Sequence, residues 1–88
     1  MKMIIAIIRD IDNEPVSQAL VQDGFRVTRI ASTGGFLRRG YSTLMVGVED
    51  DKVDAAIEIV KRSTSSPDEP GMMRATLFVL NVAHFTQV

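Results

Sequence analysis

Two apolar strands, one near each end of the chain, constrain the fold more than any other feature. Residues 3–8 are six consecutive apolar residues, and residues 73–82 form a second predicted strand around the apolar residues 77–80. Because successive side chains of a strand point to opposite faces of a sheet, such runs place apolar side chains on both faces. We therefore expect both strands to be covered on both faces.

The residues that follow the first strand predict a helix and two further strands. A helix is expected over residues 15–23, because Asp12 or Asn13 can cap its start and Gly24 can take the left-handed conformation that stops a helix. Residues 25–28 alternate apolar and polar side chains, as a half-buried strand does, and the alternation slips at residues 29–30, which indicates a bulge. Residues 41–48 predict the next strand.

A second helix is predicted from one apolar stripe and its acidic start. The stripe has the spacing i, i+3, i+4 and i+7 and consists of Val53, Ala56, Ile57 and Val60. The acidic residues 49–51 before it are expected to cap its N-terminus, where negative charge is favourable. Residues 63–71 are rich in serine and proline and are expected to form a loop before the last strand.

The resulting order, β-α-β-β-α-β, predicts an α+β fold of the ferredoxin-like kind. It is a sandwich in which two helices cover one face of a four-stranded antiparallel sheet. We expect residues 1–88 to form a single domain. The second face of the sheet would then expose apolar side chains, and soluble monomers rarely expose a large contiguous apolar patch. This face is therefore expected to pack against other copies of the chain in a closed cyclic assembly.

Composition excludes several functions. The 10 basic and 11 acidic residues give no net field that would attract DNA, RNA or an anionic membrane. No stretch reaches the roughly 20 apolar residues that span a bilayer, and the first apolar run is too short for a signal peptide. The chain has no cysteine, which excludes disulfides and thiolate metal sites. We expect a cytoplasmic protein without nucleic-acid partners or membrane insertion.

The sequence offers little catalytic chemistry. His84 is the one histidine, and it forms neither a catalytic triad pattern nor a metal-binding motif. The carboxylate pairs at residues 10 and 12 and at residues 50 and 51 lie where helix starts favour acids, so capping explains them better than acid–base chemistry or a divalent metal. We expect no enzyme activity, no metal and no cofactor. An acylphosphatase-like hydrolase is the enzymatic alternative, since that activity also occurs on this fold.

Residues 33–39 combine the groups that a nucleotide pocket needs. The glycines at 34 and 35 can take positive φ and expose successive N–H groups, which together hold an anion. Thr33 adds a hydroxyl, Phe36 offers a face for a base, and the arginines at 38 and 39 can bond phosphate. A turn in which Phe36 docks on the core explains the same residues equally well.

Three further positions could extend this site. Arg26 and Thr28 alternate in phase on the preceding strand, so their side chains point the same way. An ordinary solvated strand face is the other interpretation of these two residues. Gly47 interrupts the next strand, which indicates either a bulge or the close approach of another group.

Together these segments resemble the P-II-like cyclic-di-AMP receptor proteins of Gram-positive bacteria. The resemblance covers residues 1–62 and 73–88 and rests mainly on the run Thr33-Gly34-Gly35-Phe36-Leu37-Arg38, with Arg26 and Thr28 upstream and a glutamine near the C-terminus. The chain departs from the family where Gly24 and Tyr41 replace asparagine. The loop at residues 63–72 is also shorter than the family's loop between the second helix and the last strand.

The resemblance implies a homotrimer with the P-II-like fold that binds cyclic-di-AMP, or a related adenine nucleotide, at clefts between subunits. It implies signalling to a downstream protein target rather than catalysis. A ligand-free regulatory or structural interaction module of the same fold is the alternative. By position, the family's ligand contacts fall on Arg26, Thr28, Gly35, Phe36, Leu37, Gly47 and Gln87, and the site that we expect also includes Thr33, Gly34, Arg38 and Tyr41.

Overall fold

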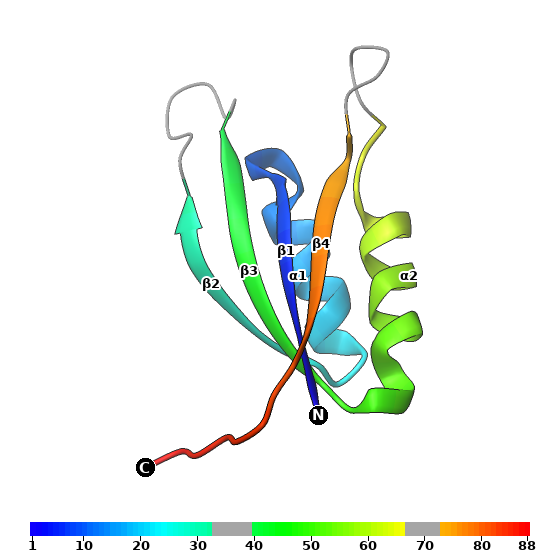
Figure 1. Cartoon of the computed structure of the whole chain (residues 1–88). Helices are drawn as coiled ribbons and strands as arrows, with labels where there is room; N and C mark the ends of the chain where they lie inside the picture. Colours follow the sequence, from blue (N-terminus) through cyan, green and yellow to red (C-terminus); the bar gives the residue numbers. More distant parts are fainter. Residues whose placement is uncertain (33–39, 67–72) are drawn as a thin grey trace.

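The computed structural model describes residues 1–32, 40–66 and 73–88 (Figure 1). Neither helix in these ranges is long and apolar enough to cross a membrane. Short 3-10 turns, η1 (Asp10–Asp12) and η3 (Asp50–Lys52), precede the two helices. The predicted order βαββαβ is confirmed, and its main elements are β1 (Lys2–Arg9), α1 (Asn13–Gln22), β2 (Arg26–Ser32), β3 (Tyr41–Val48), α2 (Val53–Ser63) and β4 (Ala75–Asn81).

The four strands form one antiparallel sheet in the order β2-β3-β1-β4. β1 lies at the centre of the sheet between β3 and β4, and its Ile5 is opposite Met45 on one side and Phe78 on the other. Figure 1 shows the two chain termini near the same end of the sheet. This arrangement is the ferredoxin-like fold that the sequence predicts.

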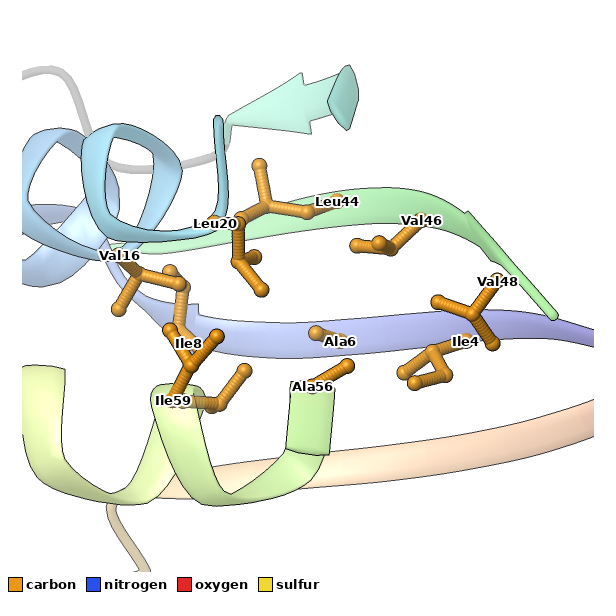
Figure 2. Packing of buried hydrophobic residues seen from close by; sticks show 11 residues of the cluster. Ile4, Ala6, Ile8, Val16, Leu20, Leu44, Val46, Val48, Ala56 and Ile59 are labelled. Atoms are coloured by element: carbon orange, nitrogen blue, oxygen red, sulfur yellow. The ribbon is translucent and has the colours of Figure 1, made fainter. Parts of the chain in front are cut away.

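The core lies between the sheet and the two helices. Alternate residues of β1 and β3 point toward the helices, because side chains alternate across a strand, and Figure 2 shows Ile8 of β1 meeting Val16 and Ile59 from the helices. Every member of this cluster is at most 3% exposed. The members are Ile4, Ala6, Ile8, Val16, Leu20, Leu44, Val46, Val48, Ala56, Ile59 and Val60.

The predicted apolar stripe of α2 faces the core. Ala56 and Val60 are buried, and Val53 and Ile57 are half-buried and pack against the core. Ile59, which the sequence did not place in the stripe, is also buried. Ala56, Ile59 and Val60 have the spacing i, i+3 and i+4, so the buried face of the helix is wider than predicted.

The opposite face of the sheet carries apolar side chains that the helices do not cover. The central positions on β1 and β3 are half-buried. On β4, Phe78 is 52% exposed and Leu80 is 42% exposed. Within one chain β1 and β4 are therefore covered on one face only, because both helices pack on a single side. We call this surface the open sheet face; it comprises Met3, Ile5, Ile7, Met45, Phe78 and Leu80.

Two local predictions from the sequence are confirmed. Gly24 has φ of +91° directly after α1, so it is the left-handed residue that ends the helix. The pairing of β2 with β3 shifts between Arg29 and Ala31, which is the bulge that the broken alternation indicated. Helix α1 itself begins two residues earlier than predicted, at Asn13.

The expected capping role of the acidic residues is wrong. Neither helix has a side-chain hydrogen bond at its cap. Asp12 is instead 2% exposed, and its Oδ1 accepts hydrogen bonds from the backbone N and the Oγ of Ser65, at 3.0 and 2.8 Å. Its Oδ2 lies 3.4 Å from Nη2 of Arg9. Burying a carboxylate without a cation and hydrogen-bond donors costs more free energy than leaving an exposed helix start uncapped. The role of Asp12 is therefore decided by its tertiary partners.

The same cluster joins β1 to the segment that follows α2. Arg9 is 8% exposed, and its Nη2 also donates to the backbone oxygen of Ser65 at 2.6 Å and to that of Ser66 at 3.3 Å. Asp10 accepts a hydrogen bond from the hydroxyl of Ser42 and also does not cap α1. We call the group Arg9, Asp12 and Ser65 the Arg9–Asp12 cluster.

Candidate functional site

Four residues that the sequence predicts for the site lie together at one end of the sheet. Arg26 on β2 is directly opposite Gly47 on β3, and Thr28 is opposite Met45. Since Gly47 and Met45 are also opposite Met3 and Ile5 on β1, all these positions belong to the face away from the helices. Gln87, from the segment after β4, completes the group: Nη1 of Arg26 donates to its Oε1 at 3.5 Å.

Two cavities border these residues. The larger has a volume of about 530 Å³ and extends toward the end of α1 and the start of α2, where Gly24 and Lys52 line it. The smaller has a volume of about 240 Å³ and lies over the sheet, where Thr28 and Met45 line it. The two cavities are neighbours, because five residues line both of them: Met1, Arg26, Gly47, Phe85 and Gln87.

Gly47 allows the side chain of Met1 to approach the backbone of β3 closely. A close approach is one of the two roles that the sequence predicts for this glycine. The strand pairing runs through Gly47 without a shift, so it is not a bulge. A Cβ atom at this position would lie 3.2 Å from Cε of Met1. Because glycine has no side chain, the end of the Met1 side chain can lie close to the backbone of β3 at this point.

The charges around the two cavities differ. Asp23 and Glu49 stand beside Arg26 and Lys52 in the lining of the larger cavity. In the smaller cavity, Lys2 and Arg26 are the charged residues among the described lining. Arg26 thus lines both cavities, and a guanidinium group forms strong hydrogen bonds with phosphate. The smaller cavity can therefore hold an anionic group beside an apolar wall.

An ion pair fixes Met1 beside the cavities. The Met1 ammonium nitrogen lies 2.9 Å from Oδ1 of Asp50. The hydrogen bond from this ammonium group, and then its charge, lower the pKa of Asp50 below its usual value. Asp50 therefore carries its negative charge to a lower pH than an unpaired aspartate, and its expected capping of α2 is replaced by this contact.

Of the other predicted site residues, Tyr41 does not join this group within one chain. Thr33, Gly34, Gly35, Phe36, Leu37 and Arg38 lie outside the described residues. Tyr41 lies at the opposite end of β3 from Gly47, opposite Arg9. The two ends of β2 are six residues apart, from Arg26 to Ser32, which corresponds to about 20 Å along a strand. The cavities beside Arg26 and the last residue of β2, Ser32, are therefore at opposite ends of that strand.

Among the lining residues that the sequence did not predict for the site, Phe85 and Lys52 offer chemistry suited to a ligand. Phe85 lines both cavities and is 58% exposed, and Lys52 adds a cation to the larger one. Residues 84–88 have no helical or strand periodicity, so the sequence does not place Phe85 in any element. One sequence signal pointed to Phe85: it lies two positions before Gln87, a predicted site residue. In an extended segment, side chains two positions apart point the same way.

Comparisons with known proteins agree on the family and the fold. A family model described as "Cyclic-di-AMP receptor" matches residues 1–70. Among solved structures, a functionally unknown protein from Pediococcus pentosaceus is similar to this chain, with 32% sequence identity and a TM-score of 0.80. The match covers 99% of this chain and 96% of that one. The similarity therefore extends over both helices, all four strands and the segment that carries Phe85 and Gln87.

Proposed function

Because the chain belongs to the cyclic-di-AMP receptor family, we propose that it is a P-II-like signal-transduction protein that binds cyclic-di-AMP or a related adenine nucleotide. The ligand binds at clefts between the subunits of a homotrimer. No reaction is catalysed, and the bound state is passed to a downstream protein target. The absence of cysteine from the sequence is in keeping with action in a reducing cytoplasm.

The observation that carries this proposal is the position of Arg26. Arg26 lines both cavities and is directly opposite Gly47 on β3. An arginine can neutralise the charge of a phosphodiester and donate more than one hydrogen bond to it. Thr28 adds a hydroxyl on the same strand face, and Gln87 adds an amide next to Arg26. These are the donors that the sugar-phosphate part of a nucleotide requires.

The separation of the predicted residues supports a site shared between copies. The cavities with Arg26, and the residues Ser32 and Ser42 that flank the 33–39 segment, lie at opposite ends of β2 and β3. That separation is about 20 Å along the strand. An assembly that brings this segment of one copy next to the cavities of another would complete the site without moving the sheet.

The open sheet face supports the homotrimer. Its apolar side chains project from three strands on the side away from both helices. Contact with other copies would remove the exposed parts of Phe78 and Leu80 from water. Burial of apolar surface is worth about 25 cal/mol per Å². A small domain with a thin core gains a large share of its stability from such a contact.

Thermal unfolding of the wild type with a panel of nucleotides tests the proposal. Cyclic-di-AMP at about 100 times its Kd is expected to stabilise the protein by about 2.7 kcal/mol, because the ligand binds only the folded state. For a chain of this size the expected rise in Tm is about 10–20 °C. GMP and cytidine nucleotides serve as comparison ligands and should give smaller shifts.

Arg26→Ala is expected to reduce this ligand-induced shift while leaving the unliganded Tm nearly unchanged. Arg26 is exposed, and its side chain makes a long hydrogen bond to Gln87. Arg29→Ala is the matched control, because Arg29 is an exposed arginine on the same strand outside both cavities. Equal shifts for the two variants would contradict the assignment of Arg26. If no nucleotide shifts the wild type and the protein is still oligomeric, a ligand-free interaction module is favoured instead.

A further inference from the structure

Phe85 stands out among the residues around the cavities because it is an exposed aromatic residue. Phe25, which lines the larger cavity, is half-buried and packs against the core. Phe85 keeps 58% of its surface exposed while lining both the larger and the smaller cavity. It therefore offers a flat apolar surface to both cavities.

The segment that carries Phe85 is held next to Arg26 at defined points. Val82 donates its backbone N–H to the backbone oxygen of Met1 at 3.1 Å, which attaches the start of the segment to β1. Gln87 accepts the hydrogen bond from Arg26 on the other side of Phe85. One contact lies before Phe85 in the sequence and the other lies after it. Together they hold the segment, and so Phe85, beside the cavities.

We propose, on the basis of the proposed nucleotide-binding function, that Phe85 is a specificity-determining residue that stacks on a nucleobase of the ligand. Arg26 and Gln87 face the phosphate and ribose part, and Phe85, between the same two cavities, contacts the base. Stacking on an aromatic ring requires a planar heteroaromatic group, and it strengthens with the size of the π-face. The expected ligand class is therefore a purine nucleotide with its phosphate directed at Arg26.

The chain provides a direct optical test, because it contains no tryptophan. Phe85→Trp would place the single tryptophan of the protein between the cavities and keep an aromatic ring there, and its fluorescence can be excited apart from that of Tyr41. Titration with cyclic-di-AMP is expected to quench its fluorescence to saturation, because a stacked base quenches indole. Thr86→Trp, which places the fluorophore one residue along at a position outside both cavities, should show little quenching.

Phe85→Ala gives the corresponding loss of affinity. Calorimetric titration with cyclic-di-AMP is expected to show an affinity about 5- to 100-fold below that of wild type, with Thr86→Ala as the control that binds normally. Since Phe85 is mostly exposed, the variant should fold, and its circular dichroism spectrum and oligomer mass should match wild type.

The outcomes separate the inference from the function on which it rests. Wild-type binding together with unchanged affinity of Phe85→Ala would overturn the role of Phe85 and leave the proposed function intact. A changed oligomer mass without a change in affinity per chain would show instead that Phe85 contacts another copy. If wild type binds none of the nucleotides, the proposed function fails and the inference fails with it.

Discussion

Asp12→Ala is expected to lower the free energy of unfolding by about 3–5 kcal/mol, although Asp12 caps no helix by its side chain. The change removes a carboxylate that is 2% exposed and leaves the guanidinium of Arg9 buried without its counter-charge. It also removes the acceptor for the backbone N–H and hydroxyl of Ser65. A small domain has only about 5–15 kcal/mol of stability, so the variant should lose a large fraction of it.

Urea unfolding followed by circular dichroism, at one fixed protomer concentration, measures this effect. Asp51→Ala is the matched control, because Asp51 is an exposed acid in the corresponding turn before α2, and its loss should change stability by less than about 0.5 kcal/mol. Comparable losses for the two variants would show that the Arg9–Asp12 cluster has no special role.

Replacing both members of the pair provides a second check. Nε of Arg9 is buried and has no hydrogen-bond partner among the described residues, so the guanidinium is incompletely satisfied even in the wild type. Apolar replacement of a buried ion pair is often neutral or stabilising, whereas removal of one partner is not. The double variant Arg9→Met, Asp12→Leu is therefore expected to be more stable than Asp12→Ala.

Phe78→Glu is expected to convert the oligomer into monomers at micromolar concentration. Phe78 lies on the open sheet face of β4, opposite Ile5 on the central strand, and 52% of its surface is exposed in one chain. If copies pack on this face, the new carboxylate would be buried against apolar side chains without a partner, which costs several kcal/mol per subunit. Size-exclusion chromatography with light scattering measures the mass directly.

Val21→Glu is the control for this experiment. Val21 is an apolar residue of α1 that is exposed to a similar degree, on the helical side of the molecule. Its replacement should leave the mass unchanged. A wild-type monomer, or a Phe78→Glu protein with the mass of the wild-type oligomer, would show that the open sheet face does not hold copies together.

The parts of the fold that the sequence predicts are those that depend on local signals. Alternation along β2, its interruption at Arg29, and the stop at Gly24 each act over a few residues, so they can be recognised without tertiary structure. The role of Asp12 could not be recognised in this way. Its partner Ser65 is 53 positions away in the sequence, and the contact arises only when the end of α2 returns to β1.

In the candidate site, too, the features that depend on local signals could be predicted and those that depend on tertiary contacts could not. The phase of Arg26 and Thr28 on one strand face follows from alternation, and the close approach at Gly47 follows from its lack of a side chain. The separation of Tyr41 from Gly47 follows from their places at the two ends of one predicted strand, whereas its separation from Arg26 and Thr28 depends on the register between β2 and β3, which one sequence does not reveal. Phe85 was missed because its segment has no periodicity, and its place between two cavities depends on contacts with Met1 and Arg26.

Native mass spectrometry of the wild-type protein with cyclic-di-AMP tests the central claim most directly, since one spectrum counts both the copies and the ligands. The account predicts an assembly of three chains that takes up to three ligands, one for each chain, as the nucleotide is added. A protein that stays a single chain and takes up no cyclic-di-AMP under conditions in which it is folded would contradict the account.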